Sequence, residues 1–339
     1  MDIKNKILAV LKPLSLRVLE FFKKKETATR TQLTKMDKVD IIIALLPLVI
    51  FGCLLFGLRA VLVVSVCIVV CLGADFLWDI IFKKERKGIN FSAIITGLLL
   101  GLTLSSGLNV ALCVLLSVVT VALMKTVFKD KPQFVAFPIL VTRILLAVVF
   151  FGAFSHYVLP FVHTPVQWLP FDNLYIPSFS SYYYPAKYLF FGLHSGNIGE
   201  TSVLLIVVSG IYLMLRKLIN PIIPVSFIAT SFLLSLIFGE GLAVSLMGGG
   251  LFFAAMFMTL DYSFKTSPRY KKLLYGVACG LLTFILRKLF KTESVLLAVL
   301  ITDFVFFYVT RRNIKRTINF IKKPDFKKLL NKAKRVFSV

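Results

Sequence analysis

Long apolar stretches recur along most of the chain and constrain its fold more than any other feature. Most of them are roughly 17 to 25 residues long, enough for a helix to cross a hydrocarbon core of about 30 Å. Because backbone groups in lipid must satisfy their own hydrogen bonds, such stretches predict helices. We therefore expect an all-α, polytopic membrane bundle of about ten transmembrane helices, near residues 40–57, 60–82, 91–105, 108–128, 134–154, 201–218, 221–238, 241–260, 272–290 and 294–310.

The charge pattern predicts how this bundle lies in the membrane. The chain has 40 Lys and Arg against 16 Asp and Glu, a net charge of +24. In a soluble protein this excess would suggest nucleic acid, but here the basic residues follow the even-numbered stretches and fill both tails. They indicate cytoplasmic loops beside an anionic leaflet, with no nucleic acid as partner. We expect a multi-pass protein of the inner (cytoplasmic) membrane with both termini in the cytoplasm.

The charge runs also divide the chain. Residues 1–39 predict a basic amphipathic helix on the cytoplasmic face, or else a disordered basic tail, with no signal peptide. Residues 40–310 form the transmembrane domain, in which residues 155–199 make a long external loop. Residues 311–339 are a basic cytoplasmic tail. The cations Arg287, Lys288 and Lys291 break the rule, so they either snorkel or mark a wrong boundary.

A duplication is suggested by two segments with similar layout. Residues 90–104 and residues 197–213 both place a polar start with Gly or Ser before an apolar run. Two related halves of about five spans each are a common plan among membrane transport proteins.

No motif of a soluble active site is present. The sequence has no metal-ligand spacing, nucleophile elbow, phosphate-binding loop or dinucleotide fingerprint. The five cysteines are spread over apolar segments and are interpreted as core residues. The three histidines, His156, His163 and His194, fall in the external loop and are interpreted as surface residues. We therefore expect no metal site and no catalysis by this chain alone.

Acidic residues at membrane depth are the remaining candidates for chemistry. A carboxylate inside a span costs several kcal/mol unless it is paired or hydrated, so it is a functional candidate by default. The candidates for an ion path are Asp75, Glu200, Asp261 and Asp303. For Glu200 an alternative is open, since an acid beside Thr201 at a helix start also serves as a cap.

Glycines at spacings near four lie inside several apolar stretches, for example Gly97 and Gly101, and Gly276 and Gly280. They predict close approach of neighbouring helices. Close approach of a planar cofactor is the alternative.

Four segments in order resemble the NqrB/RnfD family, which contains RnfD of the Rnf electron-transport complex and NqrB of the sodium-pumping NADH:quinone oxidoreductase. Residues 195–218 are similar to its GxIGETS-plus-helix signature, and residues 92–104 to its SAVVTGLLLALTL segment. Residues 134–143 fall where the family has NPFNPALVGR, and residues 261–276 resemble its TDP…TPxG…YG turn. The resemblance covers nearly residues 40 to 310.

The resemblance implies a flavin, and the chain departs from the family at that point. Members carry FMN joined by a phosphoester to the Thr of an external Ser-Gly-Ala-Thr motif. The aligned place here reads Ser181-Tyr182-Tyr183-Tyr184-Pro185, so Tyr184 stands at the attachment position. Covalent FMN is therefore not expected, and FMN or riboflavin would have to bind non-covalently. The residues proposed to contact such a cofactor are Gly196, Gly199, Glu200, Thr201, Thr96 and Gly97.

The resemblance also implies a function. We expect a divergent membrane subunit of an Rnf-like ion-translocating electron-transport complex, with other membrane subunits as partners and the redox chemistry carried by a cofactor. The alternative is a redox-inactive paralogue that serves as a membrane scaffold or as a transporter of a flavin-like small molecule.

Overall fold

The computed structural model describes residues 34–82, 90–127, 136–150, 157–158, 160, 186–239, 246–248, 250–260, 268–289 and 293–306. Every regular element among these residues is helical, which confirms the all-α prediction. The basic tails and most of the predicted external loop lie outside the described residues. A helix occupies each predicted apolar stretch: α2 (Lys35–Phe56), α3 (Leu58–Ile81), α4 (Phe91–Leu102), α5 (Val110–Thr126), α6 (Ala136–Val149), α8 (Val203–Leu215), α9 (Ile222–Ile237), α11 (Leu251–Phe253) continued by the π-helix η3 (Ala254–Met258), α12 (Arg269–Leu289) and Ser294–Phe306.

Two of these helices have the length and composition of membrane spans. They are α2, with 22 residues, and α3, with 24. Large apolar side chains on both helices, such as Leu54, Leu58 and Val69, are exposed on the outer surface. An exposed apolar face of this extent is what a lipid-facing helix requires, so the chain is a membrane protein. The crossing of the membrane by all ten predicted stretches stays a prediction.

Helix α2 begins at Lys35, five residues before the predicted boundary, because Thr34 and Asp37 form a capping box. The backbone N–H of Asp37 donates to Thr34 Oγ1 (3.2 Å), and that of Thr34 donates to Asp37 Oδ2 (3.0 Å). These bonds satisfy N–H groups that the first turn leaves free. The proposed boundary between the tail and the transmembrane domain at residues 39 and 40 therefore falls inside a helix.

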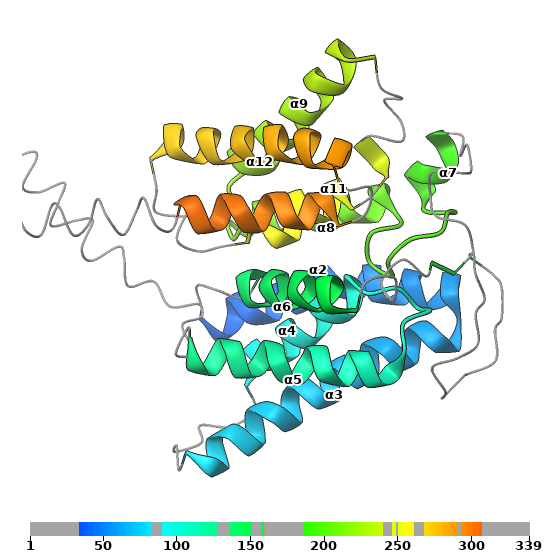
Figure 1. Cartoon of the computed structure of the whole chain (residues 1–339), viewed down its shortest axis with the longest axis vertical. Coiled ribbons are helices and arrows are strands. Elements are labelled where there is room, and N and C mark those ends of the chain that lie inside the picture. Colours follow the sequence, from blue (N-terminus) through cyan, green and yellow to red (C-terminus); the bar gives the residue numbers. More distant parts are fainter. Residues whose placement is uncertain are drawn as a thin grey trace, which may run out of the picture.

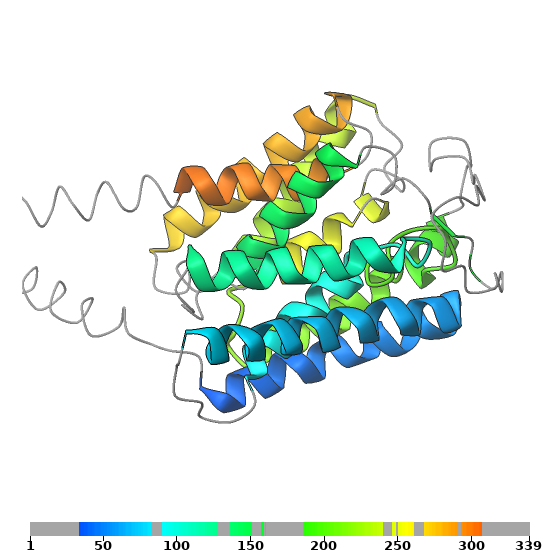
Figure 2. The ribbon, with the colours of Figure 1, turned by 60° about the horizontal axis from the view of Figure 1, so that its bottom comes forward.

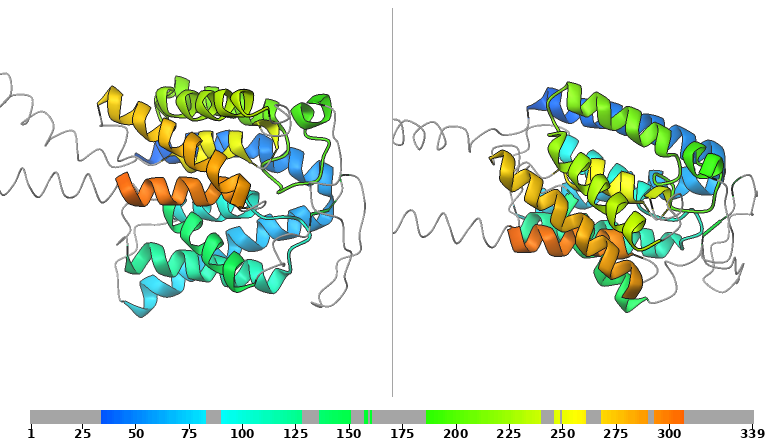
Figure 3. Two further views of the ribbon diagram at one scale, coloured as in Figure 1. Left: turned by 45° about the horizontal axis from the view of Figure 1, so that its top comes forward. Right: turned by 90° about the horizontal axis from the view of Figure 1, so that it is seen from above.

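The helices form two groups in chain order (Figure 1). Helices α3, α4, α5 and α6 pack together, and α9 packs along α12. Helix α2 joins the groups by contacting both α4 and α8. In Figures 1, 2 and 3 the start of α2 and the end of the Ser294–Phe306 helix lie at the same end of the bundle.

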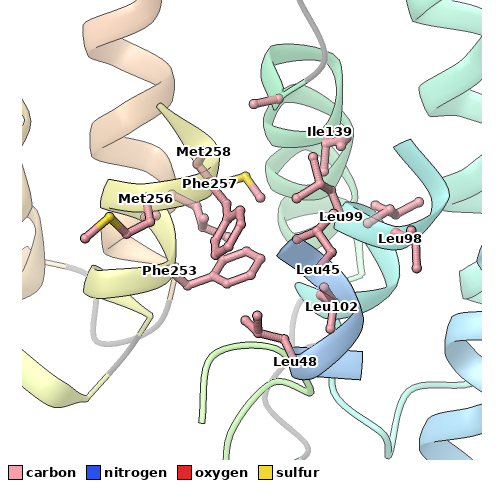
Figure 4. Packing of buried hydrophobic residues seen from close by; sticks show 14 of the residues in the cluster. Leu45, Leu48, Leu98, Leu99, Leu102, Ile139, Phe253, Met256, Phe257 and Met258 are labelled. Atoms are coloured by element: carbon pink, nitrogen blue, oxygen red, sulfur yellow. The ribbon is translucent and has the colours of Figure 1, made fainter. Parts of the chain in front are cut away.

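The short helix α11 and the π-helix η3 lie against α2 and α4, where the two groups of helices face one another. Figure 4 shows Phe253 and Phe257, from α11 and η3, pointing toward Leu45 of α2 and Leu99 of α4. All four side chains are fully buried. Among the described helices, α4 is third from α2 to α6, and α11 with η3 is third from α8 onward. The predicted correspondence of residues 90–104 with 197–213 does not follow this order, because α8 comes first in its group.

The glycine spacing has the packing role expected of it. Gly97 and Gly101 lie on the face of α4 that meets α3, and Gly276 and Gly280 on the face of α12 that meets α9. A Cβ added at Gly97 would lie 2.7 Å from a backbone Cα of α3, and one at Gly276 would lie 2.6 Å from a carbonyl oxygen of α9. These backbones approach too closely for any side chain, which confirms the helix-packing interpretation at these positions.

Two of the three cations that broke the charge rule, Arg287 and Lys288, find partners at the end of α12, and Lys291 lies outside the described residues. Arg287 Nη2 donates to the carbonyl oxygen of Gly248 (3.1 Å). Lys288 Nζ lies 4.7 Å from the ring centroids of both Phe238 and Phe284. Since α12 ends at Leu289, the predicted boundary at residue 290 is right, and both charges are bound by the protein rather than marking a wrong boundary.

Candidate functional site: a buried acid turn before helix α8

The turn of residues 193–202 lies between α7 (Ala186–Phe191) and α8 and holds most of the predicted site. Two backbone hydrogen bonds fasten it to the end of α4. The N–H of Ile198 donates to the carbonyl oxygen of Leu104 (2.9 Å), and that of Gly199 to Leu102 (2.8 Å). The irregular backbone at this place is therefore satisfied by protein, which is what a non-helical segment inside a bundle requires.

Two glycines make this fit possible. A Cβ added at Gly199 would lie 2.6 Å from Cβ of Leu102, and one at Gly52 of α2 would lie 2.7 Å from the carbonyl oxygen of Ile198. Gly196 is different, because an added Cβ would only touch Thr201 at an ordinary 3.5 Å. The turn is thus held between α2 and α4, and the space beside Gly199 is filled by protein atoms.

This packing bears on whether the residues predicted to contact a flavin lie together. Thr96 and Gly97 do not join Gly196, Gly199, Glu200 and Thr201, since Gly97 faces α3 and the Thr96 hydroxyl donates to the carbonyl oxygen of Ser92 (2.9 Å). In the part of the chain that the structure describes, these six residues therefore do not face one common space. Tyr184, the residue at the expected attachment position, lies outside the described residues.

Glu200 is buried in the turn, with 9 % of its surface exposed. Its Oε2 accepts a hydrogen bond from Nδ2 of Asn197 (2.8 Å). The carboxylate also lies against Gly250, where φ is +70° and any Cβ would collide with it. The capping alternative is wrong for Glu200, because α8 begins at Val203 and its N-cap is Ser202, whose hydroxyl accepts from the N–H of Leu205 (3.4 Å).

An arginine from α6 completes the site. Arg143 is 1 % exposed and makes a two-pronged ion pair with Glu293, with Nε to Oε2 at 3.0 Å and Nη2 to Oε1 at 2.6 Å. Glu293 has φ +58°, a conformation that is rare for a residue with a side chain. Strain of this kind persists only where the surroundings hold the residue in place, and the ion pair does so here.

The pKa values in the turn follow from burial. Burial raises the pKa of Glu200 to about 7, although the charge of Arg143 and the hydrogen bond from Asn197 act in the opposite direction. Burial also raises the pKa of the Tyr157 phenol, and the charge of Glu293 adds to that effect. The pKa of His194 falls to about 4 through burial, so its ring is neutral at pH 7. The interpretation of His194 as a surface residue is wrong, since only 3 % of it is exposed. His156 and His163 lie outside the described residues.

Two other acids of the predicted ion path lie elsewhere and have partners. Asp75 of α3 pairs with Lys125 Nζ (2.7 Å) and accepts from Asn90 Nδ2 (3.2 Å). Asp303 accepts from the hydroxyl of Tyr275 (2.6 Å). Asp261 lies outside the described residues. In the part of the chain that the structure describes, no three His, Cys, Asp or Glu side chains gather as metal ligands.

Neither Arg143 nor Glu293 was singled out from the sequence. The available signals were a lone arginine inside the apolar stretch 134–154 and an acid between two stretches. A charge that is buried in a span needs a partner, so Arg143 alone predicts that one exists. The identity of that partner cannot be predicted from the sequence, because Arg143 and Glu293 are 150 positions apart.

The chain is similar to proteins of known assemblies. It is 29% identical over 252 residues to the D subunit of the Na(+)-translocating ferredoxin:NAD(+) oxidoreductase complex of Acetobacterium woodii, covering 73% of this chain and 79% of that protein. It is 26% identical over 265 residues to the D subunit of the proton-translocating ferredoxin:NAD(+) oxidoreductase complex of Clostridium ljungdahlii, covering 73% and 80%. The match to the D subunit of the ion-translocating oxidoreductase complex of Methanosarcina acetivorans is 25% over 244 residues, covering 72% and 77%.

A family model agrees with these similarities and with the motif order. The model of the NQR2, RnfD, RnfE family matches residues 23–318, which include every described element. The buried turn with Glu200 lies inside this match, as does the Arg143–Glu293 pair. The chain is a member of the NQR2, RnfD, RnfE family.

Proposed function

We propose that the protein is a divergent membrane subunit of an Rnf-like complex that couples electron transfer to ion translocation. Family membership carries this proposal, together with three relatives that are each named as the D subunit of such a complex. Its partners are then the other membrane subunits of that complex and an anionic cytoplasmic leaflet. The chain supplies position and electrostatics, and the redox chemistry belongs to cofactors.

The proposed topology is a bundle of about ten spans in the inner membrane with both termini in the cytoplasm. Helices in all the predicted stretches support it, as does the common end at which the described chain begins and ends (Figure 2). A plan of two related halves is supported by the short third elements, α4 and α11 with η3, that meet in the core (Figure 4).

The proposed ion path uses buried acids, with Glu200 as the first candidate. Glu200, Arg143 and Glu293 together carry one negative charge in excess, and a buried carboxylate without a counter-charge takes up a proton or a cation. Asp303 and Asp75 are further candidates. Asp75 is paired with the charge of Lys125, so its own charge is less available, whereas Asp303 accepts a hydrogen bond from the neutral Tyr275.

We further propose that no FMN is bound covalently. Tyr184 at the attachment position supports this, since the family's bond forms at a Thr. The close packing of Gly199 against Leu102 also leaves a flavin no room at that residue. Electrons would then pass through a flavin held on a partner subunit, or through one held loosely away from the turn.

Purification of the chain from its own cells tests the proposal. A tag on the chain should retain the other subunits of an ion-translocating oxidoreductase, identified by mass spectrometry. A denaturing gel viewed under ultraviolet light should show no flavin fluorescence at the mass of this chain, with a covalent flavoprotein as the positive control. Purification of the chain without such subunits would contradict the proposal and favour the scaffold or transporter alternative. A fluorescent band would refute the loss of covalent FMN.

A further inference from the structure

We propose that the turn before α8 forms a binding site for a monovalent metal cation, with the carboxylate of Glu200 and the side-chain oxygen of Asn197 as ligands. This inference rests on the proposed function, which requires an ion path but does not say where a cation is held. Na⁺ is the probe by which the site is tested.

The first observation is an unused ligand atom. Asn197 is 5 % exposed, and its Oδ1 has no hydrogen-bond partner in the part of the chain that the structure describes. Buried polar atoms almost always have a hydrogen-bond partner, so an atom without one indicates that an ion or a water molecule binds there. The Nδ2 of the same amide donates to Oε2 of Glu200 (2.8 Å), so the unused oxygen belongs to an amide that is already bonded to the carboxylate.

The second observation is the charge balance around the turn. Arg143 comes from α6, and its Nε and Nη2 donate to the two carboxylate oxygens of Glu293. Glu200 is therefore the second acid near a cation that is already paired. Asn197 and Tyr157, the other polar neighbours that act on this cluster, carry no positive charge. Among the described groups Arg143, Glu293 and Glu200, one negative charge is left over in a buried place, and a cation would neutralise it.

The third observation is that the carboxylate is held in position. Gly250, with φ +70°, leaves room only for a hydrogen where the carboxylate lies, and the backbone of the turn is bonded to the end of α4. Oxygen atoms of carboxylate and amide groups are the ligands that hard cations prefer. The carboxylate of Glu200 and the amide oxygen of Asn197 therefore supply two protein ligands for a cation at a place with excess negative charge.

Thermal unfolding of the purified full chain in detergent tests the site. At pH 8.5, where a proton competes least, NaCl should raise Tm in a saturable way over choline chloride of equal ionic strength, by roughly 2 to 5 °C. The Glu200→Gln variant should lose this rise, and in choline chloride it should be as stable as the wild type or more so, which shows that it folds. The Asn197→Ala variant keeps the charge and should need at least tenfold more NaCl for half of the effect.

The matched control is Asp79→Asn, which removes a largely buried acid that pairs with Lys125 on another part of the bundle. It should keep the full Na⁺-dependent rise. No rise with NaCl over choline chloride in the wild type would overturn the site, and so would an equal rise in Glu200→Gln. A response to pH alone would also overturn it, since a site for protons only is not a metal-cation site. None of these results depends on the complex, so the proposed function can survive the loss of the site.

Discussion

Replacing Arg143 with methionine is predicted to destabilise the protein strongly. The side chain is 1 % exposed and makes two short bonds to Glu293, so the substitution leaves a buried carboxylate with no counter-charge. Breaking a buried ion pair from one side costs about 3 to 5 kcal/mol. For a chain of 339 residues, with an unfolding entropy of about 2.1 cal/mol/K per residue, this lowers Tm by roughly 4 to 7 °C. The assay is thermal unfolding of the purified chain at pH 7, followed by circular dichroism.

Two further variants make this prediction specific. The double variant Arg143→Met with Glu293→Gln removes both charges of the pair, so it should recover most of the loss, because only the excess charge of Glu200, present in the wild type as well, then stays buried. The control is Arg216→Met, which breaks an ion pair to Asp40 of similar length (3.0 Å), in which the Arg216 side chain is 53 % exposed. An exposed pair contributes about 0 to 1 kcal/mol. A loss in Arg143→Met no larger than in the control would refute the role of the buried pair, and so would a double variant that loses as much as the two single variants together.

Three further predictions concern the same region. Because the pKa of Glu200 is raised to about 7 in the folded chain, the stability that its protonated form contributes should be complete below about pH 4.5 and lost as pH rises through 7. This decline corresponds to about 3 kcal/mol in the free energy of unfolding. Glu200→Gln should remove it, as seen in Tm values measured across this pH range. Gly199→Ala should cost about 1 to 3 kcal/mol by overpacking, while Gly73→Ala, with no atom within 4 Å of the new Cβ, should cost nothing or stabilise its helix. Lys217→Gly should raise Tm slightly by relieving a φ of +60°, whereas Glu293→Gly, at a similar φ, should lower it through loss of the ion pair; equal shifts would contradict our account.

The helices could be predicted well from the sequence, because an apolar run of this length in lipid must form a helix to satisfy its backbone hydrogen bonds. Each predicted apolar stretch contains a described helix, and the glycine spacing predicted close helix contacts at Gly97 and Gly276. Boundaries were less predictable where side chains set them. Helix α2 starts early through the Thr34–Asp37 capping box, and the eighth stretch contains a short helix followed by a π-helix rather than one long helix.

The candidate site was only half predictable, because its parts come from distant places in the chain. Glu200 was found since an acid next to an apolar stretch stands out locally. Its role as a cap was excluded only by the position of Ser202, and the burial of His194 followed only from the way the turn packs. The pairing of Arg143 with Glu293 could be identified only from the structure, because the sequence around either residue does not indicate its partner.

Cation uptake by the intact complex tests the central claim most directly. Membrane vesicles that contain the complex would be supplied with reductant and acceptor, and uptake of ²²Na⁺ or of protons would be followed beside electron transfer. We predict that Glu200→Gln lowers uptake at least tenfold per electron transferred, while Asp79→Asn leaves the ratio unchanged. Uptake by Glu200→Gln that equals the wild type in both assays would contradict a role for this acid in the ion path.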